Sequence, residues 1–179
     1  MSRVAPVAWR SEGLEKVPMP TLIAGVGYTC LRDLSFGPVL VDRLKAFTWP
    51  EGVEVEDLSY SPVAVFQKLT EKRYTKIVFV GAVKRGREPG TIQRYRPDGP
   101  LPDEGEIHAR IGEGVTGVVS LESLLIVCRF FEALPEDVVV LEVEPEDESW
   151  GDGFTPAVQE SLEQVIKMVR EEVRVLEDG

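Results

Sequence analysis

Short hydrophobic runs alternate along this chain with stripes of hydrophobic residues at helical spacing. The runs predict strands at residues 21–24, 53–58, 76–80 and 137–143. The stripes predict helices at residues 35–47, 61–69, 120–134 and 155–173. Because strands and helices alternate, we expect an α/β domain of three layers, in which a twisted, mostly parallel sheet lies between helices.

Residues 83–119 interrupt this alternation. Thr91–Tyr95 and Glu106–Ile111 have the pattern of extended segments, and the Pro97-Asp98-Gly99-Pro100 sequence between them favours a turn. We therefore predict an extended, hairpin-like excursion from the edge of the sheet. The first 20 residues mix proline, glycine and charge with little periodicity, so we predict an N-terminal extension at 1–20 and one domain at 21–175.

The composition fits one packed domain in a reducing compartment. Hydrophobic residues make up 43% of the 179 residues, which is enough for a single core. No apolar run approaches the about 18 residues of a membrane span, and the N-terminus lacks the apolar stretch of a secretory signal. Cys30 and Cys128 lie far apart and form neither a disulfide framework nor a metal-ligand pair. We therefore predict a cytoplasmic protein that does not associate with membranes.

The charge balance argues against nucleic acid as a partner. The chain carries 31 acidic and 20 basic residues, and its net charge of -11 repels phosphates. Eight of the basic residues nevertheless fall between Lys72 and Arg96. This cluster is either a solvated face or a docking patch for an acidic partner.

A parallel sheet places its functional site beyond the carboxyl ends of the strands. Three segments meet this condition: residues 25–37, residues 81–90 and the stretch that leads into Ser120. The Gly25-Val26-Gly27 turn lacks the third glycine of a dinucleotide-binding fingerprint, so we expect no nucleotide cofactor.

In their order and spacing, three segments resemble the hydrogenase maturation endopeptidases. They are Gly25-Val26-Gly27 with the helix after it, residues 77–92 with the Pro89-Gly90-Thr91 sequence, and residues 138–145 with the helix start at Thr155-Pro156. The resemblance covers residues 20–175. It implies a twisted sheet between helices and a metal-dependent endopeptidase. It also implies a particular substrate, the large subunit of nickel–iron hydrogenase, from which such enzymes trim a C-terminal extension after nickel insertion.

The chain departs from this family pattern at all three metal-contact positions. The family carries an acid where this chain has Leu34, an Asp where it has Gly81, and a His where it has Ser120. Leucine and glycine offer no side-chain donor and a neutral hydroxyl is a poor ligand, so we predict that this site holds no metal.

Three further residues bear on this site. Tyr28 stands where the family has an Asn, and Asp33 is the remaining member of a pair of adjacent acids. The only histidine, His108, falls in the predicted excursion. It reaches the site only if that excursion folds back over the ends of the sheet.

These departures lead to a main hypothesis and two alternatives. The main hypothesis is a family member without metal or other cofactor, a pseudo-enzyme that binds a hydrogenase large subunit or another assembly protein without cleaving it. The cleft candidates are Tyr28, Asp33, Leu34, Gly81, Lys84, Arg85, Arg87 and Ser120. The three basic residues among them could meet a carboxylate or an acidic peptide. The alternatives are an active endopeptidase with a variant site and a small-ligand site that Tyr28 closes.

Overall fold

The computed structural model describes residues 20–115 and 119–174. Its strands are β1 (Thr21–Gly25), β2 (Val53–Asp57), β3 (Lys76–Ala82), β4 (Ile92–Tyr95) and β5 (Asp137–Val143). Its α-helices are α1 (Phe36–Leu44), α2 (Pro62–Lys72), α3 (Glu104–Val115), α4 (Leu121–Phe130) and α5 (Pro156–Arg174). A short 3-10 helix, η1 (Arg32–Ser35), leads directly into α1.

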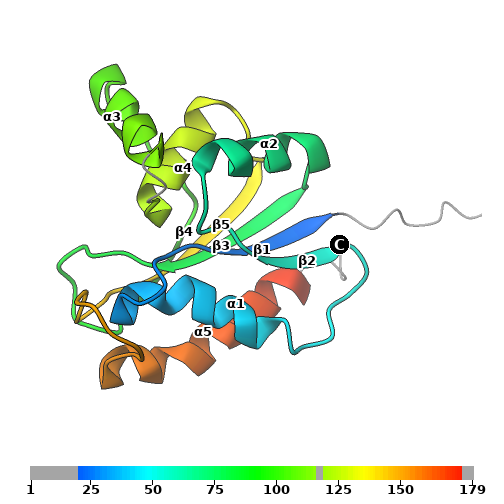
Figure 1. The fold of residues 1–179 in the computed structure, drawn as a ribbon. Coiled ribbons are helices and arrows are strands. Elements are labelled where there is room, and N and C mark those ends of the chain that lie inside the picture. The colour runs from blue at the N-terminus through cyan, green and yellow to red at the C-terminus, as the bar shows by residue number, and fades with distance from the viewer. Residues whose placement is uncertain (1–19, 116–118, 175–179) are drawn as a thin grey trace, which may run out of the picture.

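The strands form one sheet in the order β2-β1-β3-β5-β4. The first four strands of this order pair in parallel, and β4 pairs antiparallel with β5 at the edge. Helices α1 and α5 cover one face of the sheet, while α2, α3 and α4 lie on the other (Figure 1). The predicted three-layer α/β fold with a mostly parallel sheet is confirmed.

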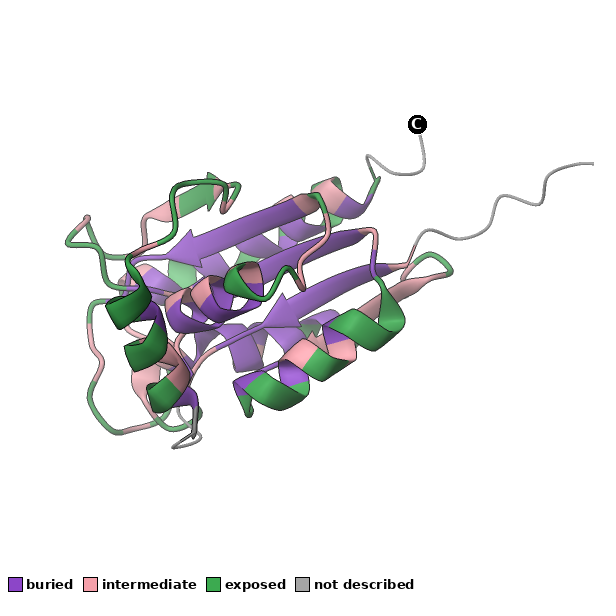
Figure 2. Cartoon of the chain, turned by 90° about the horizontal axis from the view of Figure 1, so that it is seen from above, coloured by how far each residue is buried: buried purple, intermediate pink, exposed green. Residues whose placement is uncertain are grey.

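The hydrophobic pattern of each strand and helix explains these layers. Strand β3 is almost wholly buried, as expected for a central parallel strand covered on both faces (Figure 2). On one face, Phe36 and Leu40 of α1 pack with Leu162 of α5 in one hydrophobic cluster. On the other face, Leu69 of α2 and Leu124 of α4 belong to a second cluster. The sheet thus separates two cores.

The predicted excursion at residues 83–119 is only partly extended. Strand β4 falls where Thr91–Tyr95 was expected, but its partner is β5 and not residues 106–111. Those residues belong to helix α3, so the hairpin interpretation is wrong there. A local signal explains the helix: the Asp103 carboxylate accepts the backbone N–H of Glu106 at 3.0 Å, as an N-cap residue does. Ile107 then supplies the buried side of the helix.

Two further predictions concern the ends of the chain and membranes. Apart from Pro20, the predicted N-terminal extension at 1–20 lies outside the described residues. No helix in the described ranges is both long and apolar enough to cross a membrane.

The core of α5 offers a direct test of the packing. Replacing Leu162, which is fully buried, with alanine should lower the free energy of unfolding by about 2–5 kcal/mol, because the mutation removes buried methyl groups and leaves a cavity. The exposed neighbour Glu163 is the matched control, and Glu163→Ala should change it by less than about 0.5 kcal/mol. Urea unfolding of both variants measures the difference. Equal stability of the two variants would contradict this packing.

Candidate functional site at the carboxyl edge of the sheet

Backbone hydrogen bonds join the loops that follow β1, β3 and β5. The N–H of Val26, after β1, donates to the carbonyl of Val80 at 2.9 Å. The N–H of Gly90, in the loop after β3, donates to the carbonyl of Glu144 at 2.9 Å. The N–H of Gly151, before α5, donates to the carbonyl of Cys30 at 3.0 Å. The three loops therefore form one continuous edge of the molecule.

Gly81 lies at the end of β3, where this edge is too tight for a side chain. A Cβ atom at this position would lie 2.7 Å from the carbonyl oxygen of Val26 and 3.0 Å from Cδ2 of Leu121. The first of these neighbours is backbone, which cannot rotate away. An aspartate of the family pattern therefore does not fit at position 81 unless the surrounding chain moves.

The other two positions that the resemblance assigns to the metal site are also without a suitable donor. Leu34 has an aliphatic side chain, and its carbonyl oxygen already accepts the N–H of Tyr28 at 2.9 Å. The Ser120 hydroxyl caps α4 by accepting the N–H of Ser123 at 3.1 Å. The lone histidine, His108, is an exposed residue of helix α3 rather than of an extended segment.

The residues at these positions do not fit a metal ion. A divalent transition ion in a protein takes about three or four nitrogen, oxygen or sulfur ligands, mostly from charged or imidazole side chains. Leu34 and Gly81 supply none, and Ser120 supplies a neutral hydroxyl with a structural role. Within the described ranges, no three His, Cys, Asp or Glu side chains come together as a group that could hold such an ion.

Asp33 is a structural anchor of this edge. Its side chain is fully buried, and its two oxygens accept four hydrogen bonds of 2.8–2.9 Å. The donors are the N–H groups of Glu146 and Asp147 and both the N–H and the hydroxyl of Thr155. Asp33 was a candidate for the cleft, but these contacts use its carboxylate to fix the loop before α5.

Tyr28 lies half-buried in the first loop, as a residue that lines a site would. Burial, and then the negative charge of Glu113 on α3, raise the pKa of its hydroxyl above the ordinary value. Tyr28 therefore stays a neutral hydrogen-bonding group. A role for Tyr28 in closing the site over a ligand stays a prediction.

Two arginines of the loop after β3 are held by buried glutamates of β5 and the residues just after it. Arg85 pairs with Glu122 at 2.6 Å and with Glu142 at 3.2 Å. Arg87 pairs with Glu142 and, at 3.1 Å, with Glu144. Glu142 and Glu144 are 1% and 2% exposed, so these are ion pairs at the boundary of the core. Carboxylates of the same molecule therefore neutralise much of the charge of Arg85 and Arg87.

Lys84 points elsewhere, and its ammonium pairs with Glu148 at 2.5 Å. With Lys84, Arg85 and Arg87 all paired to carboxylates, the sequence prediction of an open basic docking patch loses much of its electrostatic basis. Reversing these charges would also strand the buried glutamates, which costs stability. Their role in partner binding stays a prediction that a charge reversal cannot test cleanly.

Glu144 pairs with Arg87 and also fixes the backbone of the loop after β3. Its carboxylate accepts the N–H groups of Arg85 and Gly86 at 2.9–3.0 Å. Burial by itself raises the pKa of Glu144, but these hydrogen bonds and the Arg87 guanidinium outweigh it, so the pKa lies below its ordinary value. Sequence reasoning missed Glu142 and Glu144. The available signal was one carboxylate within a valine- and leucine-rich buried strand and a second just after it, where a buried charge requires partners.

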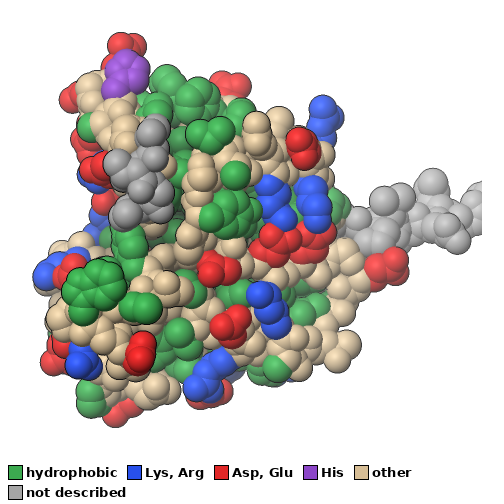
Figure 3. All heavy atoms as spheres, viewed as in Figure 1, with side chains coloured by type: hydrophobic (Ala, Val, Ile, Leu, Met, Phe, Trp, Pro, Cys, Tyr) green, Lys and Arg blue, Asp and Glu red, His purple; other side chains and the backbone are tan. Residues whose placement is uncertain are grey.

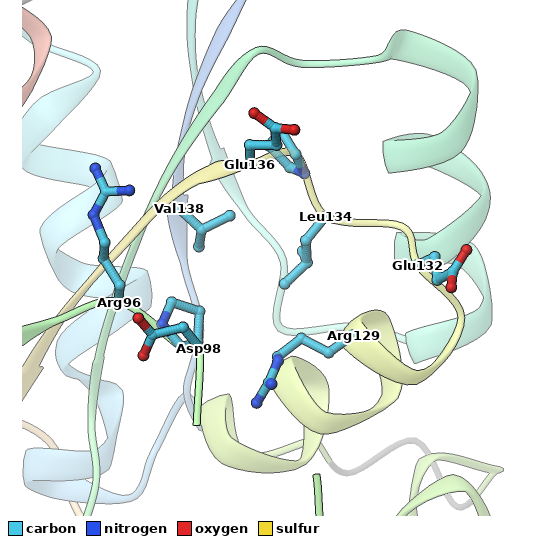
Figure 4. A pocket seen from close by; sticks show the side chains of 9 residues that line it. Arg96, Asp98, Arg129, Glu132, Leu134, Glu136 and Val138 are labelled. Atoms are coloured by element: carbon cyan, nitrogen blue, oxygen red, sulfur yellow. The ribbon is translucent and has the colours of Figure 1, made fainter. Parts of the chain in front are cut away.

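Two grooves of the surface differ in their position relative to the carboxyl edge. A groove of 630 Å³ runs between the turn after β4 and helices α3 and α4, with Arg85 and Glu122 on its wall. A second groove, of 350 Å³, lies at the amino end of β5, between Arg96 and Asp98 on one side and Arg129 on the other (Figure 4). Of these two grooves, the first borders the carboxyl edge.

A third, apolar pocket lies among the helices. It has a volume of 220 Å³ and is lined by residues such as Phe66 of α2, Ile111 of α3 and Phe131 after α4. Hydrophobic side chains gather around these helices, at the top of the view in Figure 3.

Comparison with known proteins identifies the fold and the family. The family model of the hydrogenase maturation proteases matches residues 38–172, which is more than half of the chain. The chain belongs to the hydrogenase maturation protease family. A putative hydrogenase maturation protease of Methanocaldococcus jannaschii is 34% identical over 77 residues, 43% of this chain and 50% of that protein. The alignment thus spans only half of that relative.

Solved structures of the family share this fold. A nickel–iron hydrogenase maturation protease, HycI, of Thermococcus kodakarensis matches with a TM-score of 0.64 and 18% identity, covering 87% of this chain and 93% of that one. The hydrogenase maturating endopeptidase HybD of E. coli matches with a TM-score of 0.61 and 24% identity, covering 86% and 94%. The order and spacing of the motifs indicated the hydrogenase maturation proteases, so the resemblance is confirmed.

The tight contact at Gly81 predicts the effect of adding a side chain there. Gly81→Ala should lower the free energy of unfolding by about 1–3 kcal/mol, because its Cβ would overlap the backbone of Val26. Gly112→Ala is the control, since no atom lies within 4 Å of a Cβ added to this helical residue, and it should stabilise α3 by up to about 1 kcal/mol. Thermal unfolding measures both. An unchanged stability of Gly81→Ala would mean that position 81 has room for the acid of the family.

The hydrogen bonds to Glu144 predict a pH-dependent contribution to stability. Because its pKa is lowered in the folded state, the stabilisation is present above the ordinary value of 4.5 and is lost as the pH falls below it. Glu144→Gln should therefore cost about 1.5–3 kcal/mol at pH 7, and this difference from the unmodified chain should shrink towards pH 3. Glu146→Gln, at an exposed position, is the control. A difference independent of pH would refute the role of the charge.

Proposed function

We propose that this chain binds the large-subunit precursor of a nickel–iron hydrogenase and does not cleave it. Membership of the maturation protease family supports the choice of partner. The carboxyl edge of the sheet, with Tyr28 and the groove beside Arg85, is the proposed binding surface.

The observation that carries the non-cleaving part of the proposal is the contact at Gly81. The family pattern calls for a carboxylate there, and the carbonyl oxygen of Val26 would lie 2.7 Å from its first side-chain atom. Leu34 and Ser120 do not replace the missing donor. Among the described residues, these three positions offer no set of ligands for an ion that would activate water or polarise a peptide carbonyl. The residues that remain can bind and orient a polypeptide.

We place this function in the cytoplasm, and its partner is a protein. The two cysteines of the chain are free, as they are in a reducing compartment. The acidic balance of the chain again disfavours nucleic acid.

The test is a binding and cleavage assay on one preparation. The full chain and a nickel-loaded large-subunit precursor from the same genome are mixed, with and without added zinc or nickel. Calorimetry should detect a complex, and mass spectrometry should find the precursor at its full mass. HybD of E. coli with its own precursor serves as the positive control for cleavage.

Two results would overturn this proposal in different ways. A shortened precursor would establish the alternative, an active endopeptidase with a variant site. Absence of a complex at micromolar concentrations would mean that the precursor is not the partner.

A further inference from the structure

Trp150 is exposed to an extent that is unusual for its size. It lies in the loop between β5 and α5, and 80% of its surface is accessible to solvent. The next most exposed large hydrophobic residue within the described ranges is Val63, at 59%. An isolated exposed hydrophobic residue is common on protein surfaces. Trp150 differs from such residues because its large indole lies on a loop that hydrogen bonds fix. Tryptophan is among the residue types enriched at the energetic centres of protein interfaces.

The loop that carries Trp150 is fixed from below. The buried Asp33 carboxylate accepts the N–H groups of Glu146 and Asp147 on one side of Trp150 and that of Thr155 on the other. Arg32 donates its N–H to the carbonyl of Gly151 at 3.0 Å. An indole on such a loop loses little further entropy when a partner covers it, which favours affinity.

The same contacts place Trp150 beside the candidate site. Gly151, the residue after it, pairs with Leu31 in a parallel bridge, and Leu31 directly precedes η1, which contains Leu34. The loop before α5 and the segment after β1 lie side by side (Figure 1). A polypeptide bound at the carboxyl edge of the sheet would therefore reach Trp150.

The surroundings of Trp150 are acidic. Residues 146–152 contain four acids and no basic residue, and Arg32 and Lys84 pair with two of the four, Asp147 and Glu148. The loop thus keeps a net negative charge. A surface complementary to it has an apolar pocket for the indole and basic residues around that pocket.

We propose that Trp150 is the anchor by which this chain docks on the hydrogenase large-subunit precursor, with its indole in an apolar pocket edged by Lys or Arg. This inference rests on the proposed function, since that function supplies the partner. It adds the loop before α5 to the proposed binding surface and makes Trp150, rather than the arginines after β3, the anchor of that surface.

The first experiment measures the affinity of variants for the nickel-loaded precursor. Trp150→Ala should weaken binding at least about 30-fold, and Trp150→Phe should weaken it less. Val63→Ala is the matched control, because Val63 of α2 is the second most exposed large hydrophobic residue within the described ranges, and its affinity should stay within about 2-fold. The midpoint of thermal unfolding should be unchanged in all variants, because Trp150 and Val63 are both largely exposed. Binding should also weaken with added salt.

The second experiment observes the indole directly. The full chain is labelled with 5-fluorotryptophan, and Trp150→Phe identifies the fluorine resonance of Trp150. Addition of the precursor should shift this resonance, while that of Trp49, whose Nε1 donates to the carbonyl of Leu44, should stay unchanged.

The outcomes separate the two proposals. If the unmodified chain binds the precursor and Trp150→Ala binds equally well with an unmoved fluorine resonance, the anchor is refuted and the proposed function stands. If the unmodified chain does not bind, the proposed function fails and this inference fails with it.

Discussion

The carboxyl edge of the sheet depends on buried carboxylates that accept backbone N–H groups. Loop backbone that is withdrawn from water must find other hydrogen-bond partners, and an unpaired buried N–H is costly. Asp33 meets this requirement for the loop before α5, and Glu144 meets it for the loop after β3. Each carboxylate is in turn stabilised by its donors, so the loops and the charges support one another. These two carboxylates therefore fix the loop before α5 and the loop after β3 at this edge.

The tightness of that edge decides what chemistry it can perform. The same close approach that joins β1 to β3 leaves no room for a side chain at Gly81. The chain has the architecture of the hydrogenase maturation proteases, and Leu34, Gly81 and Ser120 offer no charged or imidazole donor at the positions that the resemblance assigns to the metal. Asp33 and Glu144 hold loops through hydrogen bonds. The proposal of a chain that recognises a polypeptide without hydrolysing it rests on these observations.

Charge at the surface differs from charge along the sequence. The basic residues after β3 form a conspicuous cluster in the sequence, yet Arg85 and Arg87 pair with the buried Glu142 and Glu144. The surface around Trp150, by contrast, keeps an excess of acids. An interaction surface on this molecule is better located by exposure of apolar area and by the net charge left after pairing than by the density of basic residues.

Much of the fold could be predicted from local patterns. Hydrophobic periodicity determined the strands, the helices and the three-layer arrangement, because burial on one or both faces requires those spacings. Motif order determined the family. Helix α3 was missed, although Asp103 and Glu106 carry a capping signal that outweighs the apparent extended pattern.

The candidate site was harder to predict from the sequence. The role of Asp33 depends on donors 113–122 positions away in sequence. Arg85 and Arg87 pair with glutamates 55–57 positions away on β5 and just after it, and Arg85 also pairs with Glu122, 37 positions away on α4. The sequence alone predicted which residues lie at the carboxyl edge and which donors of the family pattern this chain lacks. Only the tertiary structure decided which charges form internal ion pairs. It also decided that Gly81 has no room for a side chain and that Trp150 remains exposed. Each of these properties depends on packing between residues far apart in the sequence.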